Sequence, residues 1–205
     1  LNSRGEVLLE SRGIRIWGSG GVRTLVQPGD PAPGAGSAFV QLSGAALNDA
    51  GQVVFAGQYL RQGRPASGLW LADGGSLRVV AKYGDWVPSL FPQTLVSFAN
   101  PVISETGSVA FVADTAGRVA ERPAGYDSRG VFVWKQGGLW VAAPSGLALP
   151  GAGTLAYQTV PVPVFDAADQ LWWNAEAGGV PVLLRWQIDA GTALFARTGQ
   201  APVVT

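Results

Sequence analysis

The sequence predicts an all-β protein: a β-propeller, or propeller-like fold, of four four-stranded repeats of about 50 residues each, either complete or part of a larger ring. Three observations predict this fold. One turn motif recurs four times, each copy is followed by alternating apolar residues, and an apolar run with a tryptophan comes next. We place the repeats approximately at residues 1–46, 47–102, 103–163 and 164–205 of one domain.

Each repeat opens with a short polar residue and has a turn-forming residue three positions later. Side chains of Asn, Asp and Ser accept hydrogen bonds from nearby backbone N–H groups, and Gly or Asp tolerates the positive φ of a tight turn. We therefore interpret these residues as structural, in a turn between two strands. The pairs are Asn2 and Gly5, Asn48 and Gly51, Ser104 and Gly107, and Asp166 and Asp169.

A first and a second strand are predicted after each turn. The first alternates apolar residues, as a half-buried strand does. The second contains Trp17, Trp70, Trp134 or Trp186, which we expect to pack between repeats. In the first three repeats a Gly-Gly pair then predicts a tight hairpin into a third strand. A fourth β-like run, at Ala38–Leu42, Leu95–Phe98 and Leu155–Val160, leads into the next turn.

The repeats differ in length because of insertions between the first and second strands. The turns begin 48−2 = 46, 104−48 = 56 and 166−104 = 62 residues apart. The excess falls in Gln58–Ser67 and Thr115–Ser128, which are rich in Gly, Arg, Pro or Ser. Insertions at one recurrent position predict loops on one side of the fold, where binding sites commonly lie.

The two ends of the chain suggest two further expectations. The chain begins at Leu1, inside a repeat and without an initiator Met, so we expect it to be part of a longer precursor. The first repeat lacks a strand before Asn2, and Val203–Thr205 resembles the start of such a strand. Either this C-terminal segment pairs beside the first repeat and closes a ring, or both ends were cut by processing.

Composition excludes several classes of function. Lys and Arg number 14, as do Asp and Glu, so no net charge attracts nucleic acid or an anionic membrane. His, Cys and Met are all absent, which removes disulfides, thiol nucleophiles, His-based triads and His or Cys metal sites. We expect no cofactor, no metal, no nucleic-acid partner and no membrane span in this chain.

The motif resembles that of a known family. The Asn-x-x-Gly-x-x-x-Phe core from Asn48 to Phe55, Gly-Leu-Trp at Gly68–Trp70 and Gly-Asp-x-x-Pro at Gly84–Pro88 are similar to those of bacterial exported tandem-repeat proteins with the NxxGxxxF motif. The resemblance implies a propeller-like fold and an extracellular or cell-envelope location in bacteria. It implies no catalytic residue, and it is weakest in the last repeat, where Asp169 and Trp173 replace Gly and Phe.

We assign no catalytic residue, because turn chemistry explains most of the acids. Asp49, Asp166 and Asp169 lie in the predicted turns, and Asp30 and Asp85 in Gly-Asp loops, where Asp bonds to the local backbone. The acids not explained in this way are Glu105, Asp114, Glu121, Asp127 and Glu176.

Candidate binding residues lie in the long insertion and in one loop. The insertion contains Arg118, Glu121, Arg122, Tyr126 and Asp127, a set that suits a sugar or a protein partner but also an ordinary solvated loop. Trp86 follows Gly84-Asp85 in a loop, so it either stacks on a ligand or is buried under the insertion.

Three functions remain open. The first is a non-catalytic exported propeller that serves as a structural or protein-interaction subunit of a bacterial envelope assembly. The second is a glycan-binding module that uses Trp86 and the Thr115–Ser128 insertion. The third is a carboxylate-based polysaccharide hydrolase or lyase that uses Glu121, Asp127 and Glu176.

Overall fold

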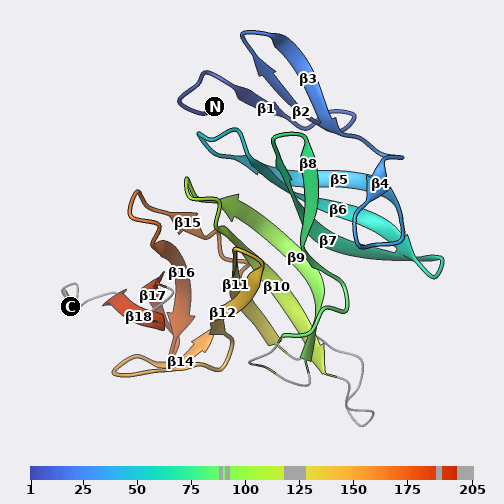
Figure 1. The fold of residues 1–205 in the computed structure, drawn as a ribbon. Coiled ribbons are helices and arrows are strands. Elements are labelled where there is room, and N and C mark those ends of the chain that lie inside the picture. The colour runs from blue at the N-terminus through green and yellow to red at the C-terminus, as the bar shows by residue number, and fades with distance from the viewer. Residues whose placement is uncertain (88–89, 91–92, 118–127, 188–190, 198–205) are drawn as a thin grey trace.

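The described residues of the chain form four antiparallel β-sheets that follow one another in sequence order (Figure 1). The computed structural model describes residues 1–87, 90, 93–117, 128–187 and 191–197. Among these residues there are strands and turns but no α-helix. The all-β prediction is therefore confirmed.

The first two sheets are built from the N-terminal strands. The first contains β1 (Val7–Leu9), β2 (Ile14–Gly18) and β3 (Gly21–Val26). The second sheet has the order β4-β5-β6-β7-β8. Its strands are β4 (Pro31–Ala32), β5 (Ser37–Leu47), β6 (Val53–Arg61), β7 (Arg64–Asp73) and β8 (Ser76–Lys82).

The last two sheets complete the described fold. The third has the order β12-β11-β10-β9, from β9 (Gln93–Ile103), β10 (Val109–Gly117), β11 (Ser128–Lys135) and β12 (Gly138–Pro144). The fourth has the order β13-β14-β16-β17-β18, and β15 also pairs with β16. Its strands are β13 (Ala148–Leu149), β14 (Gly153–Ala156), β15 (Val164–Phe165), β16 (Leu171–Ala177), β17 (Val180–Gln187) and β18 (Gly191–Arg197).

The sheets are offset by one strand from the sequence repeats. The apolar run at the end of the first repeat becomes β5, and this strand pairs with β6 of the next repeat. In the same way β9 pairs with β10. The predicted turn at Asn48 or Ser104 thus joins two paired strands of one sheet, and the run before it belongs to the sheet that follows.

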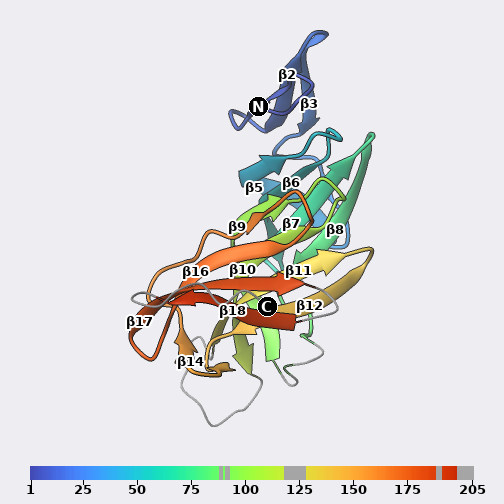
Figure 2. The same cartoon turned by 90° about the vertical axis from the view of Figure 1, so that its left-hand side faces the viewer.

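Hydrophobic cores lie between successive sheets, which stack face to face along the chain (Figures 1 and 2). Ile14 and Ile16 of the first sheet pack with Phe55 and Trp70 of the second. Alternate residues of each strand point to opposite faces, so Val54 and Leu71 of the second sheet face the third instead. The first and fourth sheets lie at opposite ends of the stack (Figure 1).

The repeated tryptophans pack as expected in three sheets, but not all in the same register. Trp17, Trp134 and Trp186 each lie opposite the first residue of the preceding strand. Trp70 lies opposite Phe55, two residues further along that strand, and Ala72 takes the position of the other tryptophans. All four side chains nevertheless share the face directed toward the N-terminal side of the stack, because a shift of two residues preserves the face of a strand.

The first predicted insertion is a strand hairpin and not a loop. Residues 58–67 extend β6 and β7, which pair without interruption to a two-residue tip between Arg61 and Arg64. Its polar residues pair in the ladder, so the Gly and Arg content misled the prediction. The second insertion begins and ends in β10 and β11, and its central residues 118–127 lie outside the described residues. The C-terminal segment Val203–Thr205 lies outside them too.

Candidate functional site

The four repeated turns lie in a row along one edge of the stack, because they precede the equivalent strands β1, β6, β10 and β16 of successive sheets. Their fourth residues have positive φ: 73° at Gly5, 80° at Gly51, 82° at Gly107 and 61° at Asp169. The first residue of each turn accepts a hydrogen bond from the N–H three residues later, at 3.1 Å in all four turns. This row of turns is called the turn ladder below.

Side chains of the turn ladder connect each repeat to the next. The amide Nδ2 of Asn2 donates to the carbonyl oxygen of Asn48 at 3.0 Å, and Nδ2 of Asn48 donates to that of Ser104 at 2.9 Å. In the third turn Thr106 Oγ1 donates to Asp169 Oδ2 of the fourth turn at 2.8 Å. In the first two turns, the residue at the first position therefore serves both its own turn and the contact between repeats.

Carboxylates of the turn ladder also accept hydrogen bonds from neighbouring repeats. The N–H of Ser3 donates to Asp49 Oδ1 at 2.6 Å, and that of Asp49 donates to Glu105 Oε2 at 2.9 Å. The Ser3 N–H holds the pKa of Asp49 below its ordinary value. This bond favours the charged form of Asp49. Both carboxylates serve as hydrogen-bond acceptors between neighbouring repeats.

Asp169 is the most enclosed carboxylate of the ladder. Burial alone would raise its pKa, but the Ser104 and Thr106 hydroxyls and the Lys135 ammonium outweigh burial, so its pKa is lowered. Lys135 Nζ lies 2.9 Å from Asp169 Oδ2. This ion pair fixes the fourth turn against the third sheet.

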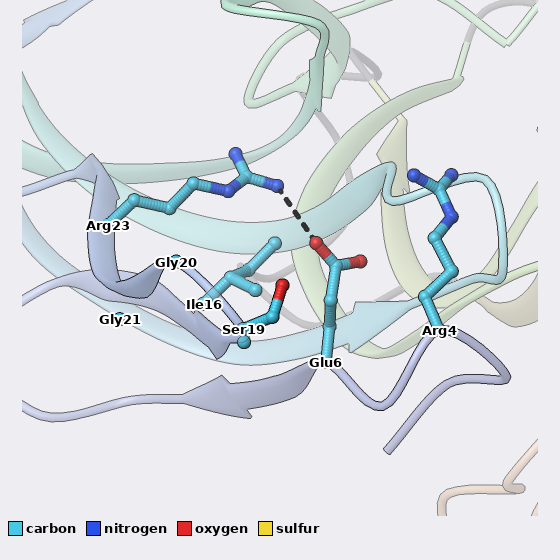
Figure 3. A pocket seen from close by; sticks show the side chains of 8 residues that line it. Arg4, Glu6, Ile16, Ser19, Gly20, Gly21 and Arg23 are labelled. Carbon is cyan, nitrogen blue, oxygen red and sulfur yellow. Dashed lines mark ion pairs between the residues drawn. The ribbon is translucent and has the colours of Figure 1, made fainter.

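A pocket of about 270 Å³ lies at the first rung of the ladder (Figure 3). Its polar lining consists of Arg4, Glu6, Ser19 and Arg23, with Ile16 among the apolar residues. The Glu6 carboxylate stands between the two arginines and lies 3.6 Å from the Arg23 guanidinium (Figure 3). A hydrogen bond from Asn2 keeps the pKa of Glu6 low. Glu6 partly neutralises the charge of the two arginines, so an anionic ligand would have to displace the Glu6 carboxylate.

A second surface lies at the opposite end of the second sheet, beside the tip of the β6–β7 hairpin. Arg61, Arg64 and Tyr83 line a groove of about 220 Å³ there. The Arg61 guanidinium lies 5.4 Å from the centre of the Tyr83 ring. Trp86 follows three residues later and is 44% exposed, and Tyr83 is 39% exposed. These four residues are called the Arg–aromatic surface below.

The structure places the predicted binding residues in two groups. Trp86 is partly exposed and forms an isolated bridge with Thr94. The others, Arg118, Glu121, Arg122, Tyr126 and Asp127, lie outside the described residues. Sequence reasoning missed Arg61, Arg64 and Tyr83; the two arginines that flank Gln62-Gly63 were the available signal.

The remaining described acids have structural partners or stand apart. Asp114 is buried and accepts from Arg129 Nε at 2.8 Å and from Ser97 Oγ at 2.7 Å. Glu176 lines a groove with Tyr157 and Asn174 that contains no other described acid. Within the described part of the chain no three His, Cys, Asp or Glu residues gather as a metal site.

Comparison with known proteins gives a family but no described activity. A family model, described as "Family of unknown function (DUF7453)", matches residues 1–200. A search of curated proteins finds no match. In the described residues no helix has the length and apolar character needed to cross a membrane.

Proposed function

Because the chain belongs to the DUF7453 family, whose function is unknown, we propose from its structure that it is a propeller-type repeat scaffold of the bacterial cell envelope. It acts without catalysis, as a structural or protein-interaction subunit. The envelope location follows the resemblance of its motif to bacterial exported repeat proteins.

The order of the strands supports the propeller-type scaffold. Propeller blades are antiparallel sheets of four strands, and neighbouring blades pack face to face. β9–β12 form such a sheet, and the second sheet has four long strands, β5–β8, with the two-residue β4 at its edge. Each of these two sheets packs against the next sheet through a core of its own. Because the last strand of each repeat pairs in the next sheet, neighbouring sheets are joined by the chain as well as by packing.

The hydrogen-bond and ion-pair partners of the described acidic residues support a role without catalysis. Asp49, Glu105 and Asp169 accept hydrogen bonds in the turn ladder, and Asp114 pairs with Arg129. Hydrolysis of a glycoside commonly needs two carboxylates that flank one bond. The groove at Glu176 has one described acid, so no observation favours the hydrolase or lyase.

The Arg–aromatic surface is the observation that carries the interaction role. Aromatic residues and arginine dominate the energetics of protein interfaces, because they bury large areas and still make polar contacts. Arg61 ends β6, and Tyr83 and Trp86 follow the end of β8, two strands away in the same sheet. β10 ends at Gly117 and β11 begins at Ser128, at the corresponding end of the third sheet.

Chemical crosslinking in the producing cells tests this role. A photo-reactive group at Gln62, in the hairpin tip, should capture a discrete partner in the envelope fraction. The substitutions Tyr83→Ala and Trp86→Ala should each reduce the yield at least several-fold. Trp140→Ala is the matched control, because Trp140 is an exposed tryptophan on β12. Equal yields in all variants, or protein found in the cytoplasm, would contradict the proposal.

A glycan is the second candidate ligand, and one observation favours it. Tyr83 and Trp86 are partly exposed aromatic residues of the kind that stack on sugar rings, and Arg61 and Arg64 add positive charge nearby. This combination suits an acidic glycan. Calorimetry with polygalacturonate should show binding that Trp86→Ala weakens and Trp140→Ala does not. No heat with the unmodified protein would remove this candidate.

A further inference from the structure

We propose that the outer face of the first sheet is a docking surface for one further repeat unit of the same type, whose last strand pairs with β1. The inference deepens the proposed scaffold role and rests on it. Three features of the first sheet lead to it: an uncovered apolar face, an incomplete rung of the turn ladder and a strand edge without a described partner.

Trp17 is exposed at a position that is buried in the other sheets. It is 50% exposed, whereas Trp134 is 7% and Trp186 is 6% exposed. All three lie opposite the first residue of the preceding strand and share one face. Trp134 and Trp186 are buried because the preceding sheet covers them. The first sheet keeps the tryptophan, and the described residues provide no cover.

The neighbours of Trp17 repeat this pattern. Val7 lies opposite Trp17 and is partly exposed, whereas Val53, Val109 and Leu171 at the equivalent position are fully buried. On the other side Trp17 pairs with Val22, which is 55% exposed. The uncovered face thus has the apolar residues of an interface between repeats.

The first rung of the turn ladder is incomplete on the same side. Each of Asn48 and Ser104 accepts a bond at its carbonyl oxygen from the turn before it, in addition to the bond inside its own turn. The carbonyl oxygen of Asn2 has the internal bond, from Gly5 N–H, but no described side-chain donor. It is oriented as an acceptor for the first residue of a preceding turn.

Space over the turn glycines agrees with this assignment. A Cβ on Gly51 would lie 3.4 Å from the Arg4 guanidinium, and one on Gly107 would lie 3.0 Å from Gln52 Oε1. Those side chains belong to the preceding repeat. Around Gly5 no described atom lies within 4 Å of the Cβ position. The place of the preceding side chain is open there.

The edge of β1 is the third feature of the first sheet that favours an added unit. β6 pairs with β5 on one side and β7 on the other, and β10 pairs with β9 and β11. Among the described strands β1 pairs with β2 alone. A repeat unit that ends in a strand equivalent to β9 would fill this edge, because β9 enters the turn at Ser104 as such a strand would enter the turn at Asn2. An unpaired strand edge favours that addition.

The fourth sheet of a second copy is a poor occupant. Its outward face presents Trp172 and Arg185, where the second sheet presents Val54 and Leu71 to its successor. The Arg185 guanidinium lies 5.8 Å from the Trp172 ring, and Trp172 Nε1 donates to Asp166 Oδ2. Asp166 as a carboxylate has no N–H to donate to the Asn2 carbonyl. The face of β1–β3 therefore fits another unit with aliphatic residues and an Asn-type turn.

A fusion protein tests the proposal directly. Residues 31–103 are duplicated in place of Leu1, so that the copy of Ile103 precedes Asn2 as Ile103 precedes Ser104. Acrylamide quenching isolates Trp17 when each protein is compared with its Trp17→Phe variant. The Trp17 emission should be quenched readily in the parent chain and several-fold less in the fusion. A folded fusion with Trp17 still fully quenched would overturn the proposal.

The matched control carries Val54→Lys and Leu71→Lys in the added copy only, which places charges on the face directed at Trp17. Quenching of Trp17 should return in this control. If protection remains, the added face does not cover Trp17 and the proposal is wrong.

Two further measurements decide the remaining cases. If limited proteolysis shows that the added unit is unfolded, a synthetic peptide of residues 93–103 is added to the parent chain. Hydrogen exchange at the amides of Val7–Leu9 should slow, and unchanged exchange would overturn the proposal. If the chain without the added unit self-associates and this protects Trp17 from quenching, the occupant of the face is a second copy and the proposal is wrong. These measurements use purified protein and do not depend on the envelope partner. If the crosslinking experiment finds no partner, the proposed function fails, but the results for Trp17 still test the docking surface.

Discussion

At the scale of single residues, Asp169 shows how one position serves two purposes. It takes a positive φ where the other three turns have Gly, and its carboxylate accepts bonds from Thr106, Ser108 and Lys135. An Asp in a left-handed conformation costs some backbone strain. The ion pair and hydrogen bonds to the third repeat offset that strain.

Acid should weaken the protein through this residue. A carboxyl whose pKa is lowered by folding stabilises the native state above its unfolded pKa, about 4. This contribution is lost as the pH falls through the lower native pKa of Asp169. Urea unfolding should therefore give a constant stability from about pH 7 to 5 and a decrease below about pH 4. Asp169→Asn should be less stable at pH 7 and show a smaller decrease in acid; an unchanged pH profile would contradict the assignment.

Gly57 is a second residue whose role depends on its neighbours. A Cβ at this position would lie 2.7 Å from the Phe39 ring and 2.9 Å from the Trp70 ring. Gly57→Ala should therefore destabilise the protein by about 1–3 kcal/mol, as overpacking of a core does. Denaturant unfolding measures this cost. Gly20→Ala is the control, because Gly20 has open space and should change little.

At the scale of elements, the turn ladder ties hairpins of different sheets together. Asn48 is buried, accepts from Gln52 N–H within its turn and donates from Nδ2 to Ser104 of the next. The turn and the contact between repeats use different atoms of one side chain. Substitutions can therefore separate the two roles.

Asn48→Asp should keep the bond inside the turn and lose the donor to Ser104. The carbonyl oxygen of Ser104 then faces a carboxylate. The free energy of unfolding should fall by about 1–3 kcal/mol at neutral pH. Protonation of the new Asp restores a donor, so the cost should shrink in acid. Thermal unfolding at pH 7 and pH 4 compares the two states. A cost independent of pH would indicate that the bond between repeats contributes little.

At the scale of the whole molecule, stability comes from the faces between sheets. Each internal sheet is buried on both faces, and its two sets of alternating residues enter two different cores. Such a stack derives its stability from nearest-neighbour contacts. The first sheet is covered on one face only among the described residues.

A pair of tryptophan substitutions measures this difference. Trp134→Ala removes a ring buried between the second and third sheets, where Arg78 also stacks on it, and should cost about 3–5 kcal/mol. Trp17→Ala removes the equivalent ring from the uncovered face and should cost clearly less. Chemical denaturation of both variants gives the comparison. Equal losses would mean that Trp17 is buried in solution.

Much of the fold was predictable because the decisive signals are local. The turn residues are recognisable because their side chains and φ preferences suit tight turns. The Gly-Gly pairs indicate hairpins such as the one at Gly74 and Gly75, both with positive φ. The β6–β7 hairpin was mistaken for a loop because its strand pairing, and not its composition, sets its conformation. The Arg–aromatic surface was only partly foreseen, since Arg61 and Tyr83 are 22 residues apart and meet through the pairing of three strands.

The sequence by itself determined the all-β class, the four turns and the alternation that gives every strand two faces, because these follow from preferences of neighbouring residues. The tertiary structure decided which strand joins which sheet, and it showed that the turn residues bond from one repeat to the next. It also distinguished Trp17 from Trp134 and Trp186, three residues with the same local pattern. Burial depends on what packs against a side chain, and that neighbour is far away in the sequence.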